Sequence, residues 1–232
     1  MHNQQRMAMA MRRRCLFLCS SAVALAVLLG ATPMGPQASG ATPARLDTAQ
    51  AAEAIHDWPP AAKAAAEEML RRYGPPQEAT ATLLVWQNNG PWKRTLVHKT
   101  PVEHDFPARH MDVLEQVVEY RVPLNFVGPL AQFNGSVLVD RTRGELIAHC
   151  DREATNVLAL NLAHDIVRGG KTIEQARDAM GAAMQDIGAG NPPADAQALR
   201  LGPPQGDLRD PGTPTVPPAG GQGTVPGPMI VR

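Results

Sequence analysis

The chain has 232 residues, of which 44% are hydrophobic and 4% aromatic, and its 22 Lys and Arg balance its 22 Asp and Glu. That length allows one or two domains. Four of the basic residues and none of the acidic ones lie within residues 1–41, so the remainder carries 18 − 22 = −4 charges. A mildly acidic remainder excludes the charge signature of a nucleic-acid-binding protein or of a polybasic membrane anchor.

Residues 1–41 are expected to be a secretory signal peptide. Arg12-Arg13-Arg14 precedes the uncharged apolar run Cys15–Leu29, and small residues and prolines follow. This run is too short for a membrane span, so we expect no stable span after cleavage at Ala31 or at Gly40-Ala41. Paired arginines also occur in twin-arginine signals, but ordinary Sec export is favoured. The expected location is periplasmic or secreted, in a bacterium.

Residues 42–57 are expected to form a linker that precedes the folded domain. Pro59-Pro60 favours the start of a helix, and Gly74-Pro75-Pro76 favours its end near Tyr73. This predicts one helix of about four turns at the beginning of the domain.

A β-hairpin is predicted next. Residues 79–87 and 92–99 alternate in the manner of strands, and Asn88-Asn89-Gly90-Pro91 between them is typical of a turn. Residues 100–110 are predicted to be a polar loop. Residues 112–121 fit a helical stripe, which we favour, although their valines and tyrosine also fit a strand. A short helix is predicted from Leu124 to Gln132.

The strongest local pattern runs from Phe133 to Gly170. Residues 136–140 and 145–148 are short apolar runs separated by a polar turn that ends in Gly144, which predicts a second hairpin. Asp151 is expected to cap a helix that continues to Arg168. Thr172 and Gln175 have the spacing of a capping box, so a second helix is predicted to about residue 187, antiparallel to the first.

From residue 189 onward Pro and Gly recur without a hydrophobic period, and residues 189–232 are expected to be a disordered tail. The folded domain is therefore predicted over residues 58–188. Its strands come as hairpins followed by helices, which predicts a single α+β domain with a small antiparallel sheet packed against helices.

One stretch is dense in metal-binding residue types. It contains His98, His104, Asp105 and His110, with Glu103 and Asp112 nearby. Imidazole and carboxylate groups together can hold a divalent metal, and a loop can fold these side chains towards one another. The alternative is a solvated loop whose histidines only cap turns, because the spacing matches no zinc motif.

Cysteine and tryptophan offer two further candidates. Cys15 and Cys19 lie in the predicted signal peptide, so Cys150 is the remaining thiol; we interpret it as buried in a strand, with a reactive thiol as the alternative. Trp86 and Trp92 flank the first predicted turn. If exposed they would stack on a ligand, and otherwise they belong to the core.

Four stretches carry a resemblance to a family: Val118–Pro123, Phe133–Val137, Cys150-Asp151 and Asn156–Ala163. They resemble an uncharacterised family of exported, periplasmic bacterial proteins over about the middle half of the chain. The resemblance implies export, and it assigns no activity and no site residue.

Two functions from different classes follow. The first is a non-catalytic binding or scaffolding module whose partner is a protein or a small-molecule ligand, favoured because no catalytic motif of high specificity is present. The second is a small metal-dependent enzyme that uses the loop 98–112. We favour the first, so the chain is expected not to be an enzyme.

Overall fold

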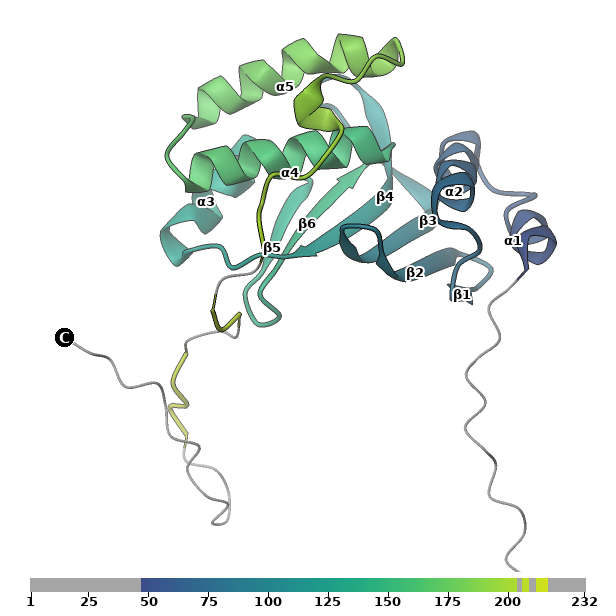
Figure 1. Cartoon of the computed structure of the whole chain (residues 1–232), viewed down its shortest axis with the longest axis horizontal. Helices are drawn as coiled ribbons and strands as arrows, with labels where there is room; N and C mark the ends of the chain where they lie inside the picture. The colour runs from purple at the N-terminus through teal and green to yellow at the C-terminus, as the bar shows by residue number, and fades with distance from the viewer. Residues whose placement is uncertain (1–46, 204–205, 209–211, 217–232) are drawn as a thin grey trace, which may run out of the picture. The chain divides into compact units, whose positions relative to one another are not determined.

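The computed structural model describes residues 47–203, 206–208 and 212–216 (Figure 1). The predicted signal peptide and residues 42–46 of the predicted linker lie outside the described residues. So do residues 204–205, 209–211 and 217–232 of the predicted tail. The described chain forms an α+β domain with an antiparallel sheet, as the sequence predicts.

In the part of the chain that the structure describes, six antiparallel strands form one sheet in the order β1-β2-β3-β4-β6-β5. They are β1 Glu78–Ala79, β2 Leu83–Asn89, β3 Trp92–His104, β4 His110–Glu119, β5 Val137–Asp140 and β6 Glu145–Cys150. Both predicted hairpins are confirmed, because β2 pairs with β3 and β5 pairs with β6. At the first turn Asn88 has φ 51° and Gly90 φ 61°, which favours asparagine and glycine there.

Two predictions between the hairpins are wrong. The expected loop 100–110 is mostly strand, because β3 continues to His104 and only residues 105–109 connect it to β4. The favoured helix over 112–121 is also strand, since β4 pairs with β3 on one side and β6 on the other. Pairing along both edges stabilises β-branched residues in a central strand, which local helical spacing does not reveal.

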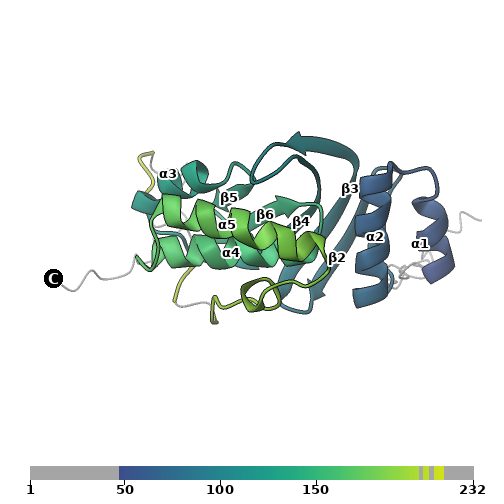
Figure 2. The same ribbon diagram turned by 90° about the horizontal axis from the view of Figure 1, so that it is seen from above.

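The helices are α1 Thr48–Ala54, α2 Pro60–Tyr73, α3 Leu124–Phe133, α4 Glu153–Val167 and α5 Ile173–Gly188, followed by the 3₁₀ turn η1 Ala194–Ala196. α4 lies on β4 and β6, and α5 runs beside α4, while α2 covers β3 and β4 (Figures 1 and 2). The Thr172–Gln175 capping box is confirmed. The predicted cap from Asp151 is not present, since α4 begins after Arg152 without a side-chain cap.

The prediction that residues 42–57 form a linker is wrong for the second half of that range. α1 occupies part of it, and Ala51 and Ile55 are almost completely buried. Ile55 belongs to a core cluster under α2 that also contains Trp58 and Met69. The folded domain therefore begins before the predicted boundary at residue 58.

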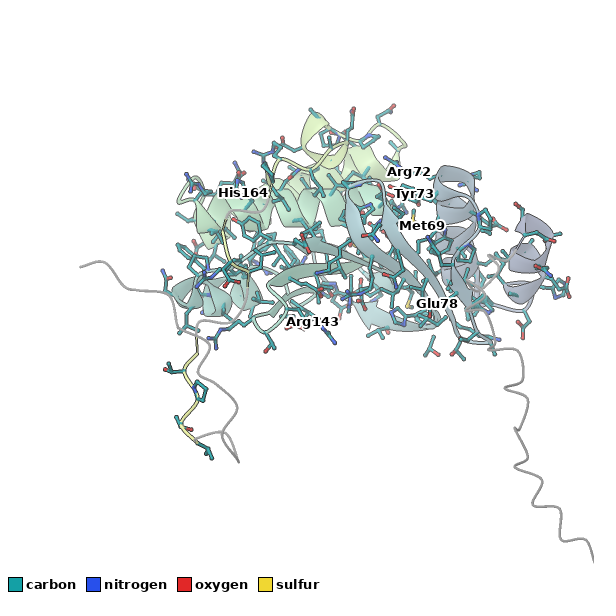
Figure 3. The ribbon with its side chains drawn as sticks, turned by 60° about the horizontal axis from the view of Figure 1, so that its bottom comes forward. Met69, Arg72, Tyr73, Glu78, Arg143 and His164 are labelled. Atoms are coloured by element: carbon teal, nitrogen blue, oxygen red, sulfur yellow. The ribbon has the colours of Figure 1, made fainter. Side chains whose placement is uncertain are left out.

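A second core cluster lies between the sheet and α3, α4 and α5, and a buried polar contact joins the two clusters. Tyr73, on the last turn of α2, donates a hydrogen bond of 2.8 Å to Glu153 at the start of α4. Arg72 also reaches Glu153, at 3.3 Å, and both α2 side chains are labelled in Figure 3. Burial, then the Glu153 carboxylate, raises the pKa of Tyr73 to about 12. Tyr73 therefore keeps its proton and its hydrogen bond at physiological pH.

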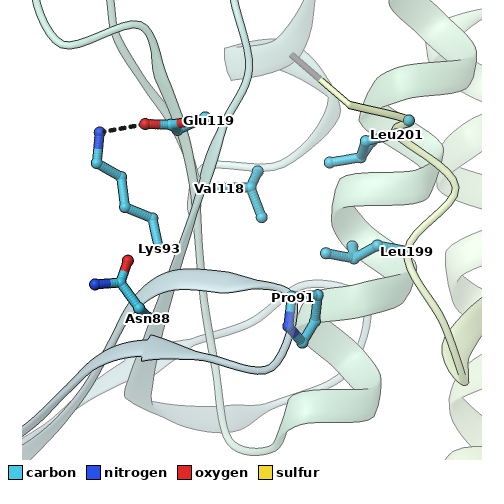
Figure 4. A pocket seen from close by; sticks show the side chains of 8 residues that line it. Asn88, Pro91, Lys93, Val118, Glu119, Leu199 and Leu201 are labelled. Carbon is cyan, nitrogen blue, oxygen red and sulfur yellow. Dashed lines mark hydrogen bonds and ion pairs between the residues drawn. The ribbon is translucent and has the colours of Figure 1, made fainter.

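The prediction of a disordered tail is wrong for residues 189–203. Ala196 is buried, and Leu199 and Leu201 pack against the core of α4. Figure 4 shows these two leucines opposite Val118 and Pro91 across a pocket of about 450 Å³. Asn161 of α4 holds the segment. Its Nδ2 donates to the carbonyls of Asp195 and Ala198 at 2.8 Å, and its Oδ1 accepts from the Arg200 amide at 2.8 Å.

We expect Asn161→Ala to lower the free energy of unfolding by about 2–4 kcal/mol, because three hydrogen bonds at a fully buried side chain are lost together. Urea titration measures this loss, and limited proteolysis should show faster cleavage within residues 189–203. The exposed Asn191→Ala is the matched control and should change stability by no more than about 0.5 kcal/mol. Equal stability of the two variants would contradict the anchoring role of Asn161.

Among the residues that the structure describes, no helix has the length and apolar character needed to cross a membrane.

Candidate metal centre

The ends of β3 and β4 bring two histidines together. His104 and His110 are directly opposite each other in the β3–β4 pairing, and their ring centroids are 5.0 Å apart. Asp112 lies two residues further along β4. Because side chains alternate along a strand, Asp112 is on the same side as His110. The hairpin therefore places two imidazoles and one carboxylate side by side.

The separations of these groups suit a shared ion. His110 Nε2 is 3.0 Å from Asp112 Oδ1, and His104 Nδ1 is 3.4 Å from Asp112 Oδ2. Two donor atoms that are each about 2.1 Å from one ion lie about 3.0–3.4 Å apart. Within the described residues, these three side chains form the one group of His, Cys, Asp and Glu whose ligand atoms are all within 4.8 Å of one another.

The hydrogen bonding of the centre leaves ligand atoms unused. His110 Nδ1 lies 2.8 Å from the Ala108 carbonyl, so this nitrogen carries a proton, and Nε2 is the nitrogen that an ion would bind once His110 gives up its second proton. Asp112 is 9% exposed, and its buried Oδ1 has no hydrogen-bond partner although His110 Nε2 is 3.0 Å away. The ring N–H direction therefore misses that oxygen. The protonated His110 ring neutralises this buried carboxylate from 3.0 Å without a well-aligned hydrogen bond, and an ion that replaced the proton would bind both atoms.

Charge at the centre favours a cation. The neighbouring Asp112 carboxylate, and then the Cys150 thiol, raise the pKa of His110 to about 11. Burial lowers the pKa of His104, although Asp112 opposes this effect. His104 is therefore neutral at pH 7, which is the form that binds metals, whereas His110 is protonated beside Asp112, and an ion would have to displace the proton on its Nε2.

Two more side chains contact the three candidate ligands. Ser136, just before β5, donates a short hydrogen bond to Asp112 Oδ2, and its Oγ is 3.1 Å from His104 Nδ1. Cys150, at the end of β6, has its Sγ 3.2 Å from His110 Nε2. Cys150 is buried, and burial raises the pKa of its thiol. It is the nearest further donor, and it lacks the exposed, low-pKa thiolate of a reactive cysteine.

His98, which the sequence grouped with His104 and His110, belongs to a neighbouring cluster. Its Nε2 is 3.4 Å from Glu115 Oε2, and His149 Nε2 is 3.1 Å from the same oxygen. Burial of Glu115 by itself raises its pKa, but the contacts with His149 and His98 outweigh burial and lower the pKa to about 2. Glu115 is therefore ionised at any physiological pH.

The other sequence candidates lie apart from the centre. Asp105 is 75% exposed in its side chain and pairs with Arg109 at 3.0 Å. Trp86 and Trp92 are each 1% exposed and belong to the two cores, so they present no ring face for a ligand to stack on. Trp86 Nε1 donates to the Gly74 carbonyl at 2.8 Å, which gives it a structural role at the end of α2.

The sequence places Asp112 near the four candidate ligands without naming it as one, and no sequence pattern groups Ser136, Glu115 or His149 with them. For Asp112 a signal exists, since His110 and Asp112 have the spacing of same-side residues on a strand. The helix predicted over residues 112–121 hides this signal, because residues two apart on a helix point in different directions.

No protein-family model, curated protein or solved structure matches the chain. The geometry of this centre is therefore the basis for assigning a function.

Proposed function

We propose that the chain is an exported bacterial protein that binds one divalent transition-metal ion, such as Zn²⁺, through His104, His110 and Asp112. The observation that carries the proposal is the buried Asp112 Oδ1, which has no hydrogen-bond partner and lies 3.0 Å from His110 Nε2. A shared ion would satisfy both atoms at once. Imidazole and carboxylate ligands favour zinc and its neighbours over Mg²⁺ and Ca²⁺, which take oxygen ligands.

The surroundings of the centre support a metal over a simple ion pair. Ser136 donates to Asp112, and the Ala108 carbonyl fixes the tautomer of His110. Such outer contacts orient the ligands of metal sites and strengthen their affinity. Cys150 offers a thiol 3.2 Å from His110 Nε2, so a thiophilic ion gains a further donor by a small side-chain movement.

Metal binding joins the two functions that the sequence suggests. The ligand of the predicted binding module is then a metal ion. The loop 98–112 contributes ligands for that ion, and no catalytic step is involved. Export rests on the charged, apolar and small-residue pattern of residues 1–41.

The test is metal stoichiometry and affinity in the full chain after chelation. Equilibrium dialysis should give one Zn²⁺ per chain, and His104→Ala should weaken binding by at least about 100-fold, because one of three ligands is lost. The exposed His56→Ala is the matched control and should bind as the wild type does. Stoichiometry near zero in the wild type, or equal affinity in the two variants, would refute the metal centre.

A further inference from the structure

A cavity of about 560 Å³ adjoins the metal centre. Asp112 and Ser136 line one part of it, and His98, Glu115 and His149 line another. Its remaining wall is mostly apolar: Thr82, Leu83, Thr100, Val102, Val113 and Leu114. The cavity therefore connects the candidate ligand Asp112 with the neighbouring His–Glu–His cluster.

Both faces of the sheet contribute to the cavity. Gln116 of β4 donates to Glu153 of α4, so strand alternation places Asp112 on the face of Gln116 and Glu115 on the opposite face. The cavity is lined by both residues beside the register shift of β3 between Val97 and Val102. Two donors of the centre are buried, since Cys150 is 4% exposed and the side chain of His110 is 8% exposed. An ion that approaches from solvent meets the cavity before it meets these buried donors.

The His–Glu–His cluster has the chemistry of a weak cation site. Its carboxylate is ionised, and two imidazole nitrogens are 3.1 Å and 3.4 Å from one of its oxygens. Its ligand atoms do not converge as closely as those of the metal centre, the one described group within the 4.8 Å limit. A site on a path must attract an ion but also release it, and looser geometry meets both needs.

We propose that this cavity is the path by which the ion enters the metal centre, and that His98, Glu115 and His149 bind the ion in transit. The inference rests on the proposed function. Glu115 supplies the negative charge that draws a divalent cation into the cavity, and Asp112 receives the ion at the inner end. The cluster changes the rate of uptake and of release, and the bound state depends on His104, His110 and Asp112.

The experiment measures uptake kinetics by stopped flow, with metal-free protein mixed against Zn²⁺ on a weaker chromogenic chelator. Glu115→Gln should slow uptake about tenfold, because the attraction of one carboxylate is lost, while the dissociation constant stays within about twofold. Glu119→Gln is the matched control. It lies on the same strand and the same face, outside the cavity, and should take up Zn²⁺ at the wild-type rate.

A second variant tests the path without a change of charge. Thr82→Trp adds bulk at an exposed position on the cavity wall and should slow uptake and release together. Wild-type rates in both Glu115→Gln and Thr82→Trp would overturn the path. So would a second Zn²⁺ per chain that Glu115→Gln removes, since the cluster would then hold an ion permanently. A wild-type protein without zinc affinity would instead refute the metal centre itself.

Discussion

We expect saturating Zn²⁺ to raise the unfolding temperature of the metal-free protein, and we expect Asp112→Asn to abolish the rise. An ion that binds only the folded chain stabilises it by about 4 kcal/mol at 1,000 times its dissociation constant. For a domain of this size that corresponds to roughly 8–16 °C. Differential scanning calorimetry of the full chain with and without Zn²⁺ measures the shift.

Asparagine keeps the shape of Asp112 and can still accept from Ser136, so the substitution tests the charge and not the packing. Asp105→Asn is the matched control, since Asp105 is exposed and lies outside the group of three ligands. It should retain the full rise. A rise of equal size in Asp112→Asn would mean that Zn²⁺ binds elsewhere on the chain.

The second large effect concerns Trp92. We expect Trp92→Ala to lower the free energy of unfolding by about 3–5 kcal/mol, because the ring is 1% exposed in the core and its removal leaves a cavity. Its Nε1 also donates to the Tyr73 hydroxyl at 3.2 Å, at the contact that joins the two core clusters. Urea denaturation measures the loss.

Trp92→Phe separates packing from hydrogen bonding at this position. It keeps most of the apolar bulk and should cost less than the alanine variant. Leu124→Ala is the exposed control, at 67% exposure, and should stay within about 0.5 kcal/mol of the wild type. A loss below about 1 kcal/mol for Trp92→Ala would mean that Trp92 does not belong to the core.

Local chemistry made much of the fold predictable. The turn Asn88–Pro91 and the polar turn before Glu145 each lie between apolar runs, so both hairpins follow from neighbouring residues. The same holds for α5, whose start is set by the Thr172–Gln175 capping box. These signals are complete within a few residues of chain.

The errors lie where distant residues decide the structure. β4 is a strand because β3 and β6 pair along both of its edges, and β6 follows it by about 30 residues. The segment 189–203 is ordered because Asn161 binds its backbone from α4. Neither the pairing of β4 nor the hydrogen bonds of Asn161 can be recognised from a hydrophobic period in the segment that they order.

The candidate site was predictable only in part, because some of its residues are close in sequence and others are brought together by strand pairing. His104 and His110 are close in sequence, so their association could be anticipated from a bend between them. Ser136 and Cys150 reach the centre only through the pairing of β5, β6 and β4. Their role depends on strand register, which spacing alone does not encode.

His104, His110 and Asp112 all belong to the two arms of the β3–β4 hairpin, at its tip. Substitutions at these three positions would therefore change the proposed ion site while most of the hydrophobic interior stays intact. Evolution would then act separately on the ligands of the proposed ion and on the stability of the fold.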